Sequence, residues 1–382
     1  MRPQALSADN VLAAAPKSAR HIPSLDGIRA ISIALVFLAH AGLDHVVPGS
    51  FGVTIFFFLS GFIITTLMRS EYERNGSINF RHFWLRRALR ILPPFYLVLF
   101  CATLAAYALF PPGTLYGPAV AAQALHVANY WVIAHGGYGI APGTDVYWSL
   151  AVEEHFYLLF PWLYVAMQRL GLSQSRQAWL LWGLCAAVFV WRCVLILGLD
   201  AQNGRTYWAT DTRGDSILFG CALAVWNNPV LDPPRLRPNA WKYVLLPSAF
   251  AALLLSIVTR NAVFKETLRY SIQGAALTIV FIAAIRFHHW PPFRFLNLKP
   301  VAFAGVLSYS LYLIHYPLLH VVARLLPQLH PVFRALIALS ASVCLAWLIY
   351  LLVEKPCARL RNRLKDDSRF TDIRSRPRSA IT

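Results

Sequence analysis

An arginine and a histidine in the first apolar segment are spaced for shared chemistry. In IPSLDGIRAISIALVFLAHAG, Arg29 and His40 stand eleven residues apart. That spacing is three helical turns plus about 20°, so a helix would place both on one face, about 16 Å apart along its axis. A neutral imidazole can take a proton near pH 7, so His40 is a candidate general base. The alternatives are that His40 only packs against a neighbour and that Arg29 only anchors the helix at the membrane surface.

A second pair of arginines precedes another apolar segment. In HFWLRRALRILPPFY, Arg87 and Arg90 stand three residues apart, next to Arg86. Residues at i and i+3 share one helical face, and two guanidinium groups placed together bind phosphate oxygens well. The alternative is a basic loop that acts only as a topology signal.

Two adjacent carboxylates lie inside a further apolar segment. The segment DVYWSLAVEEHFYLLFPWLY contains Glu153 and Glu154, whose side chains would point about 100° apart on a helix. At most one of them is expected to face the same cavity as His40. A carboxylate within a bilayer must pair with a cation or be protonated, so the structural alternative for Glu153 is an ion pair with Arg192 or Arg213.

Polar residues also interrupt the apolar segments DTRGDSILFGCALA and LSYSLYLIHYPLL. We expect Arg213 and Asp215 to form a local ion pair rather than to take part in chemistry. Small residues such as Ser308 favour close helix packing. His315, which follows Tyr309 by almost two turns, is the next candidate for a general base if His40 is not one.

Together these segments resemble the acyltransferase-3 family of membrane acyltransferases, which acylate sugars, lipid-linked glycans and macrolides. Arg29 and His40 match the family's Arg-x10-His motif, Arg87 and Arg90 match its RxxR motif, and Glu153 matches its glutamate. The segments GVTIFFFLSGFIIT, TRGDSILFG and SYSLYLIHYP stand in the family's order, so the resemblance covers about residues 24–357. His155 is a minor departure, since the family often has Gln or another polar residue there.

The resemblance implies acyl transfer, most commonly of acetyl, from acyl-coenzyme A to a hydroxyl of a sugar, polysaccharide or lipid-linked glycan. Such a reaction can also run across the membrane, with donor and acceptor on opposite sides. It implies no metal and no tightly bound cofactor, with acyl-coenzyme A as co-substrate. The roles implied are catalytic for His40 and Glu153, donor-binding for Arg29, Arg87 and Arg90, and supporting for Arg213, Asp215, Ser308, Tyr309 and His315.

Two other functions stay open at this point. One is a secondary transporter or exporter of a sugar-lipid substrate, because buried Arg, Glu and His also mark transport pathways. Inverted repeats would favour that function, and the sequence shows no repeat. The other is a membrane scaffold without chemistry.

The elements that must position these residues are transmembrane helices. Of the 382 residues, 57% are hydrophobic and only 14% are charged, with a mean hydropathy of +0.51, whereas a soluble domain carries about 25% charged residues. The apolar residues form separate blocks near the ~20 residues that span a bilayer. The predicted fold is an all-α, polytopic bundle of about ten helices, near residues 28–46, 51–68, 91–110, 147–167, 177–198, 211–228, 242–259, 270–287, 303–326 and 332–354. A short apolar stretch at 119–134 would be re-entrant or interfacial.

The basic residues predict the orientation. The net charge of +18 could suit nucleic acid, but Lys and Arg lie between the apolar blocks, as the positive-inside rule requires. With a cytoplasmic N-terminus, 27 of the 35 Lys and Arg fall in inside segments and four in outside segments. We therefore predict both termini in the cytoplasm, a multi-pass protein of the inner (cytoplasmic) membrane, and no nucleic-acid partner.

The expected parts are a mobile cytoplasmic tail (1–23), the membrane domain (24–357) and a basic cytoplasmic tail (358–382).

Reporter fusions test this orientation. A reporter at the C-terminus should report a cytoplasmic position, and one between residues 111 and 146, where Lys and Arg are absent, an external position. The measurement is the activity ratio of a periplasm-active and a cytoplasm-active reporter at each site. The same reading at both sites would contradict the ten-helix topology.

Overall fold

The computed structural model describes residues 22–201 and 204–361, and within these ranges it is helical without any strand. The predicted tails, 1–23 and 358–382, therefore lie almost entirely outside the described residues. The longer helices are α2 (Leu25–Leu38), α3 (Gly49–Asn75), α4 (Phe80–Leu109), α7 (Trp148–Arg169), α8 (Gln174–Cys193), α10 (Thr210–Val225), α12 (Leu246–Val258), α14 (Arg269–Arg286), α17 (Ser308–Leu325) and α18 (Pro331–Ile349).

Short helices connect the longer ones. They are α5 (Gly117–Ala124), α6 (Ala128–His135), α9 (Arg205–Trp208), α11 (Pro238–Ala240), α13 (Ala262–Glu266), α15 (Pro291–Arg294) and α16 (Lys299–Val306). The apolar stretch at 119–134 is thus the α5–α6 pair rather than one helix. Wider π-helical turns continue four helices, at Ala39–Leu43, Val194–Gly198, Trp241–Leu245 and Tyr350–Glu354, and 3-10 turns occur at Asp145–Tyr147 and Phe295–Asn297.

The chain is a multi-pass membrane protein by its helices, but the count of ten spans is not confirmed. Six helical segments among the described residues are long and apolar enough to cross a bilayer, or eight if each of two bent helix pairs forms one span. Each of the ten predicted segments contains one longer helix. However, α7 and α10 are not among the candidate spans, and α10 has only 16 residues, three of them charged.

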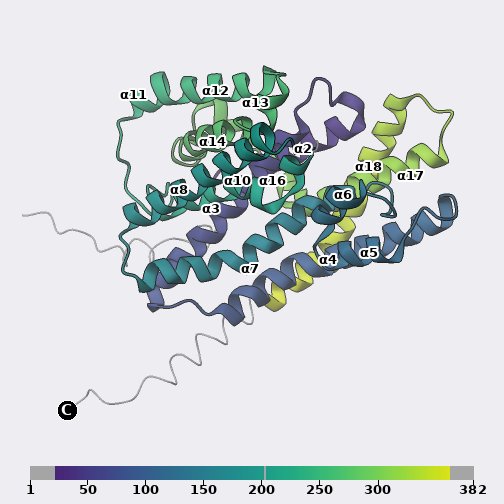
Figure 1. Cartoon of the computed structure of the whole chain (residues 1–382), viewed down its shortest axis with the longest axis horizontal. Coiled ribbons are helices and arrows are strands. Elements are labelled where there is room, and N and C mark those ends of the chain that lie inside the picture. The colour runs from purple at the N-terminus through teal and green to yellow at the C-terminus, as the bar shows by residue number, and fades with distance from the viewer. Residues whose placement is uncertain (1–21, 202–203, 362–382) are drawn as a thin grey trace, which may run out of the picture.

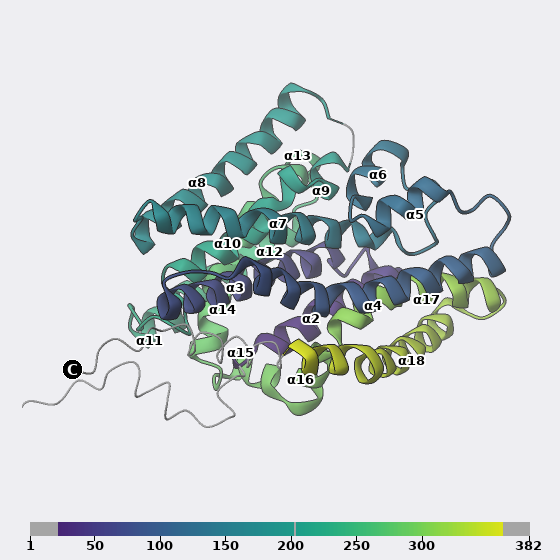
Figure 2. The same cartoon turned by 90° about the horizontal axis from the view of Figure 1, so that it is seen from below.

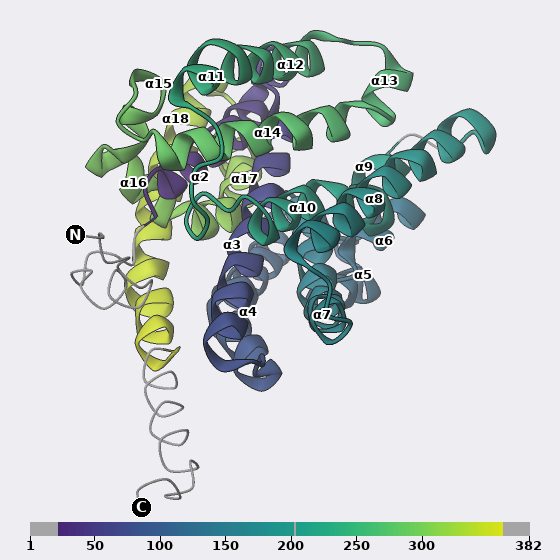
Figure 3. The ribbon, with the colours of Figure 1, turned by 90° about the vertical axis from the view of Figure 1, so that its left-hand side faces the viewer.

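Helix α3 forms the centre of the bundle. Within its most apolar window 78% of the residues are buried, against 17% for α18 at the periphery. Figure 3, which looks from the end where α11 lies, shows α2, α3 and α10 in the middle, α12 above them and α7 below. In Figure 2, α4, α17 and α18 run together along one side.

Glycines let α3 and α10 approach closely. A Cβ atom at Gly61 would lie 2.1 Å from the carbonyl oxygen of Ile217, and one at Gly220 would lie 2.1 Å from that of Phe58. Any side chain at either position would overlap with the backbone of the other helix. Small residues allow this contact because, in lipid, close packing rather than water exclusion holds helices together.

The connections gather at two ends of the bundle. In Figure 1 the α3–α4, α7–α8 and α10–α11 connections lie toward the left, and the α17–α18 turn lies at the right. Segments predicted to be cytoplasmic share the first end, which we call the basic end. Segments predicted to be external share the opposite end, where Arg324 donates to the carbonyl of Leu109 (2.9 Å) and Asn129 donates to Thr210 (3.0 Å).

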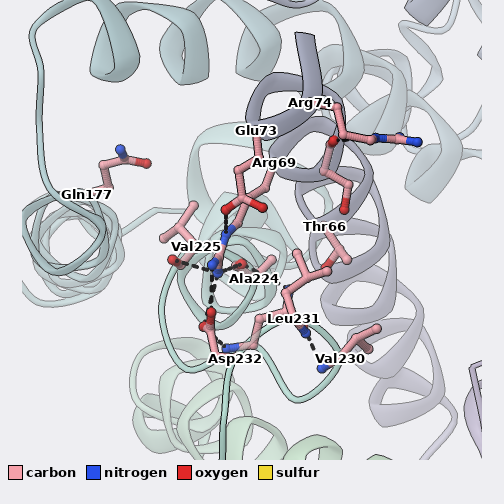
Figure 4. Close-up of polar contacts among 12 residues, drawn as sticks. Thr66, Arg69, Glu73, Arg74, Gln177, Ala224, Val225, Val230, Leu231 and Asp232 are labelled. Atoms are coloured by element: carbon pink, nitrogen blue, oxygen red, sulfur yellow. Dashed lines mark hydrogen bonds and ion pairs between the residues drawn. The ribbon is translucent and has the colours of Figure 1, made fainter. Parts of the chain in front are cut away.

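An arginine fastens the basic end (Figure 4). Arg69 of α3 donates to both carboxylate oxygens of Asp232, at 2.6 and 3.0 Å, and to Glu73 at 2.7 Å. Asp232 also accepts the backbone N–H of Asn228, while its own carbonyl accepts from Arg286 of α14. Burial opposes ionisation of the Asp232 carboxyl, but these hydrogen bonds keep its pKa below the ordinary value. The loop after α10 is thereby fixed to both α3 and α14.

Candidate active site

The predicted base lies where α2 changes its winding. His40 belongs to the π-helical turn Ala39–Leu43 that continues α2, and this turn contains Gly42 at φ 101°. A π-helical turn alters which residues share a helical face, and such turns are frequent at functional sites. A left-handed φ suits glycine because it lacks a Cβ atom, so Gly42 permits the chain to leave the helix just after His40.

His40 makes a hydrogen bond with a second histidine. Its Nδ1 lies 3.0 Å from Nε2 of His315 on α17, and its ring stacks on Tyr316 with centroids 4.2 Å apart. The two histidines are 275 residues apart in the sequence. The structure therefore joins the first candidate base to the residue that the sequence indicated as its substitute.

The hydrogen bonds of His315 determine which nitrogen of His40 is free. Nδ1 of His315 lies 2.8 Å from the carbonyl oxygen of Tyr312 and 3.1 Å from that of Leu311. A carbonyl only accepts, so Nδ1 of His315 carries its proton, and Nε2 of the neutral ring is an acceptor. Nδ1 of His40 must then donate to that acceptor, which leaves the lone pair of His40 Nε2 available to take a proton.

The backbone around His315 is held by neighbours from other segments. Pro317 has no N–H, so the carbonyl of Leu313 four residues earlier loses its helical partner. The hydroxyl of Tyr147 donates to that carbonyl at 2.9 Å. Gly143, at φ +80°, lies so close to the Tyr316–Pro317 peptide that a Cβ atom would come within 2.5 Å of it. These contacts fix the part of α17 that presents His315.

The predicted arginines line a cavity near the basic end, where α4 begins. We call it the arginine cavity. Its volume is about 90 Å³, and its lining includes Arg29, Arg87, Arg90, Glu153, Glu154, Ser60, Tyr157, Ser308, Tyr309 and Tyr312. The structure therefore brings together six of the ten predicted site residues on the wall of one cavity: three arginines, Glu153, Ser308 and Tyr309. His315 lies one turn beyond Tyr312 and does not line this cavity.

The arginines in this region differ in their ion pairs. Arg29 pairs with Asp26 at 2.6 Å, and Arg86 pairs with Glu71 at 2.9 Å. Within the described residues neither Arg87 nor Arg90 pairs with a carboxylate, although the Arg87 guanidinium lies 5.8 Å from the centroid of the Tyr157 ring. Two arginines on one helix face of a cavity are thus available to an anionic ligand.

Glu153 belongs to the arginine cavity and not to the histidine pair. Its carboxylate accepts from the Tyr157 hydroxyl at 3.0 Å, and that hydroxyl accepts from Ser60 at 2.7 Å. The ring partner of His40 is His315, and no hydrogen bond joins Glu153 to His40 in the described residues. Neither Arg192 nor Arg213 forms an ion pair with Glu153.

A second cavity lies on the other side of Tyr312. This histidine cavity has a volume of about 600 Å³ and is lined in part by the α2–α3 and α12–α13 connections, which are predicted to be external. Its lining includes His40, Asp44, Ser50, Asp145, Trp148, Tyr207, Trp208, Arg260, Lys265, Arg269 and Gln273. Val53 and Tyr312 line both cavities. Tyr312 is held in place between them, since its hydroxyl donates to the carbonyl of Val146 at 2.8 Å and lies 2.6 Å from Ser149 Oγ.

The expected pairing of Arg213 with Asp215 is wrong. Asp215 pairs instead with Arg192 of α8 at 2.7 Å, and both side chains are fully buried. The remaining N–H groups of Arg192 donate to Thr212 and Thr267 carbonyls and to Ser271. Residues at i and i+2 of a helix point to different sides, so Arg213 faces away from Asp215. Asp215 therefore joins α10 to α8 and lines neither of the two cavities.

Tyr309 and Ser308 begin α17 on the wall of the arginine cavity. The Tyr309 hydroxyl donates to the carbonyl of Ile91 at 2.8 Å, which ties α17 to α4 just before the Pro93–Pro94 pair. Among the described residues there is no group of three His, Cys, Asp or Glu that could hold a metal ion. The site places a candidate histidine base between two cavities, and arginines line both of them.

Comparison with known proteins identifies the family. The family model for the acyltransferase domain of acyltransferase-3 proteins matches residues 22–351. The chain belongs to the acyltransferase-3 family. The resemblance of the sequence motifs is thereby confirmed, and acyltransferases are favoured over the transporter alternative.

The curated relatives of this acyltransferase-3 protein include proteins named as O-acetyltransferases. The chain is 30% identical over 354 residues to peptidoglycan O-acetyltransferase OatA of Listeria monocytogenes, covering 89% of this chain and 56% of the relative. It is 31% identical over 356 residues to O-acetyltransferase OatA of Staphylococcus aureus, covering 89% and 57%. The chain thus spans little more than half the length of these relatives. No solved structure matches it significantly.

Several cavity residues of this acyltransferase-3 protein escaped sequence analysis. Ser60 and Tyr157 are uncharged and ordinary within apolar helices, so nothing in the sequence set them apart. Arg260, Lys265 and Arg269 were visible only as exceptions, because external segments of a membrane protein carry few basic residues. Their position beside His40 depends on the packing of α14 and could not be derived from spacing.

The buried Arg192–Asp215 pair predicts that Arg192 contributes more to the free energy of unfolding than Arg205 does. We expect Arg192→Met to lower the free energy of unfolding by about 3–5 kcal/mol, because it leaves a buried carboxylate without its cation. The exposed pair of Arg205 with Asp211 is the matched control, and Arg205→Met should change it by less than about 1 kcal/mol. The measurement is unfolding of the detergent-solubilised protein. Equal effects of the two substitutions would contradict a structural role for the Arg192–Asp215 pair.

Proposed function

We propose that this chain is a membrane O-acyltransferase that moves an acyl group, acetyl foremost, from acyl-coenzyme A to a hydroxyl of a glycan. One observation carries the proposal: two cavities, one lined by residues near the basic end and the other by residues of segments predicted to be external, share Val53 and Tyr312 beside the His40–His315 pair. The donor enters from the basic end and the acceptor from the opposite end. In the inner membrane, with cytoplasmic termini, this arrangement transfers the acyl group across the membrane.

The arginine cavity suits the donor. Coenzyme A carries a 3′-phosphate and a diphosphate, and guanidinium groups bind phosphate oxygens through paired hydrogen bonds. Arg90 is exposed and Arg87 is half-buried, so they would hold the phosphates at the mouth of the cavity. A volume of about 90 Å³ admits only a thin chain, which fits the pantetheine arm with the thioester at its inner end.

The transfer itself needs one base. His40 Nε2 takes the proton of the acceptor hydroxyl while the hydroxyl oxygen attacks the thioester carbonyl carbon. The new C–O bond forms, the C–S bond breaks, and the thiolate of coenzyme A leaves with the proton that His40 returns. His315 acts as a positioning residue, since its acceptor nitrogen holds His40 in the tautomer with a free Nε2.

The histidine cavity suits a glycan acceptor. At about 600 Å³ it is in the range of cavities that take small ligands. Trp148, Tyr207 and Trp208 line it, and aromatic rings offer flat apolar surfaces to the C–H faces of sugar rings. The names of the curated relatives include peptidoglycan O-acetylation, which supports a cell-wall or other surface glycan as the acceptor.

The histidine pair generates a graded prediction. His40→Ala should lower turnover by about 10²–10⁴-fold, the usual contribution of a general base. His315→Ala should lower it by about 10–100-fold, the effect typical of a residue that orients another. His315→Gln should recover part of that loss, because its amide oxygen can still accept from His40 Nδ1. The measurement is transfer of labelled acetyl in membranes of known protein content.

The donor KM serves as the control for these histidine variants, since it should stay unchanged if the arginine cavity is intact. Near-normal turnover of His40→Ala would show that His40 is not the base. Equal loss in His315→Ala and His315→Gln would contradict the positioning role.

The arginines generate a second prediction. Arg87→Gln and Arg90→Gln should each raise the KM for acetyl-coenzyme A by tens-fold, because a charge-assisted hydrogen bond contributes about 1.5–3 kcal/mol. Arg86→Gln is the matched control, since Arg86 pairs with Glu71 and does not line the cavity. Acetyl-dephospho-coenzyme A lacks the 3′-phosphate and shows which arginine binds that group. The arginine that binds it is the one whose variant has the same KM for acetyl-coenzyme A and for acetyl-dephospho-coenzyme A. Unchanged KM values in both variants would rule out the phosphate clamp.

A further inference from the structure

Three cations gather on one wall of the histidine cavity. Arg260 lies between α12 and α13, Lys265 lies in α13, and Arg269 begins α14. They are three of the four Lys and Arg in the segments predicted to be external. The fourth, Arg205, is paired with Asp211 at 2.6 Å. Basic residues are depleted on that side of membrane proteins, so their concentration in one cavity needs a reason.

None of the three forms an ion pair within the part of the chain that the structure describes. Arg260 reaches only the carbonyl of His45, at 3.5 Å, and Arg269 reaches only the carbonyl of Lys265, at 3.3 Å. The Arg269 guanidinium also lies 5.4 Å from the centroid of the Tyr270 ring. Like charges placed together repel each other, and here no carboxylate partner offsets the repulsion.

A fourth cation lies behind this wall. Arg213 is fully buried, and its guanidinium stands 3.7 Å from the centroid of the same Tyr270 ring. It donates to Thr54 at 3.0 Å, but its Nε and Nη1 have no hydrogen-bond partner among the described residues. An arginine stays charged in proteins, and its guanidinium lies 5.8 Å from the centroid of the Tyr207 ring, which lines the cavity. Arg213 therefore adds positive potential to the cavity.

Two carboxylates also line the cavity. Asp44 follows the turn that holds His40, and Asp145 precedes α7. Neither forms an ion pair with the cationic wall, which consists of Arg260, Lys265 and Arg269. The cavity therefore presents three cations that no carboxylate neutralises by an ion pair, together with the candidate base His40. An anionic group would bind against the cations, and a hydroxyl on the same molecule could then reach His40.

We propose that the acceptor is an acidic glycan, whose carboxylate or phosphate binds to the cationic wall of the histidine cavity. This inference rests on the proposed function, because it names the substrate class of the same site. The wall selects charged acceptors over neutral ones and orients them, while His40 carries out the proton transfer. Arg260, Lys265 and Arg269 are thus binding residues for the acceptor and take no part in donor recognition.

A binding experiment tests the wall independently of catalysis. The protein is the full chain carrying His40→Ala, in detergent, so that turnover does not intervene. The carboxylate probe is a fluorescent peptidoglycan glycan strand with free carboxylates, and its neutral match is the same strand after amidation. A polyprenyl diphosphate carrying the same sugars supplies the phosphate probe.

At least one anionic probe should bind at least ten-fold more tightly than the amidated strand, and the difference should shrink at high salt because exposed charges are screened. Arg269→Gln and Lys265→Gln should weaken that binding ten-fold or more and leave the amidated strand unaffected. Arg205→Gln, whose arginine is external but does not line the cavity, should change neither. The anionic probe that loses affinity identifies whether the carboxylate or the phosphate is recognised.

Equal binding of charged and amidated probes, or unchanged affinity in both variants with a normal unfolding temperature, would overturn the acidic-glycan inference. Failure of the proposed function gives a different result. In that case the wild-type chain transfers no labelled acetyl to any probe or to water, whether or not the charged probes bind.

Discussion

Because a bilayer offers no water, a polar group buried in this protein is costly unless another protein group pairs with it, and several of the decisive partners lie on other helices. The His40–His315 hydrogen bond joins α2 to α17, and the Arg192–Asp215 pair joins α8 to α10. Tyr147 satisfies the carbonyl that Pro317 leaves free. The same bonds that hold the helices together therefore orient the candidate base. Packing and chemistry cannot be separated here, since losing a partner would both loosen a helix contact and free a side chain.

The polar residues in the apolar segments were visible in the sequence because a bilayer tolerates few of them. Spacing on a helix correctly grouped Arg87 with Arg90, and both line one cavity. It could not foresee that Asp215 pairs with Arg192 rather than Arg213, since that choice depends on how α8 approaches α10. Nor could it foresee the pairing of His40 with His315, because 275 residues separate them and no local rule connects the two.

The helical class and the family followed from composition and motif order, but the number of spans did not. Hydropathy responds to the average of a segment, and the charges of α10 lower that average while packing against α3 and α8 compensates for them. A helix that is enclosed by others need not be apolar toward lipid. Hydropathy therefore misses α7 and α10, although α7 carries Glu153 and α10 packs closely against α3.

The division between the two cavities has a functional consequence under the proposed reaction. A continuous channel lined by histidines and carboxylates would conduct protons and dissipate the gradient across the membrane. Here Tyr312 is held between the cavities by Val146 and Ser149, with Val53 beside it. Only the thioester end of a bound donor needs to pass this barrier, since the acceptor hydroxyl waits on the other side with His40. The thin pantetheine arm of the donor would itself fill the passage beside Tyr312 and Val53. The acyl group then crosses the barrier while protons do not.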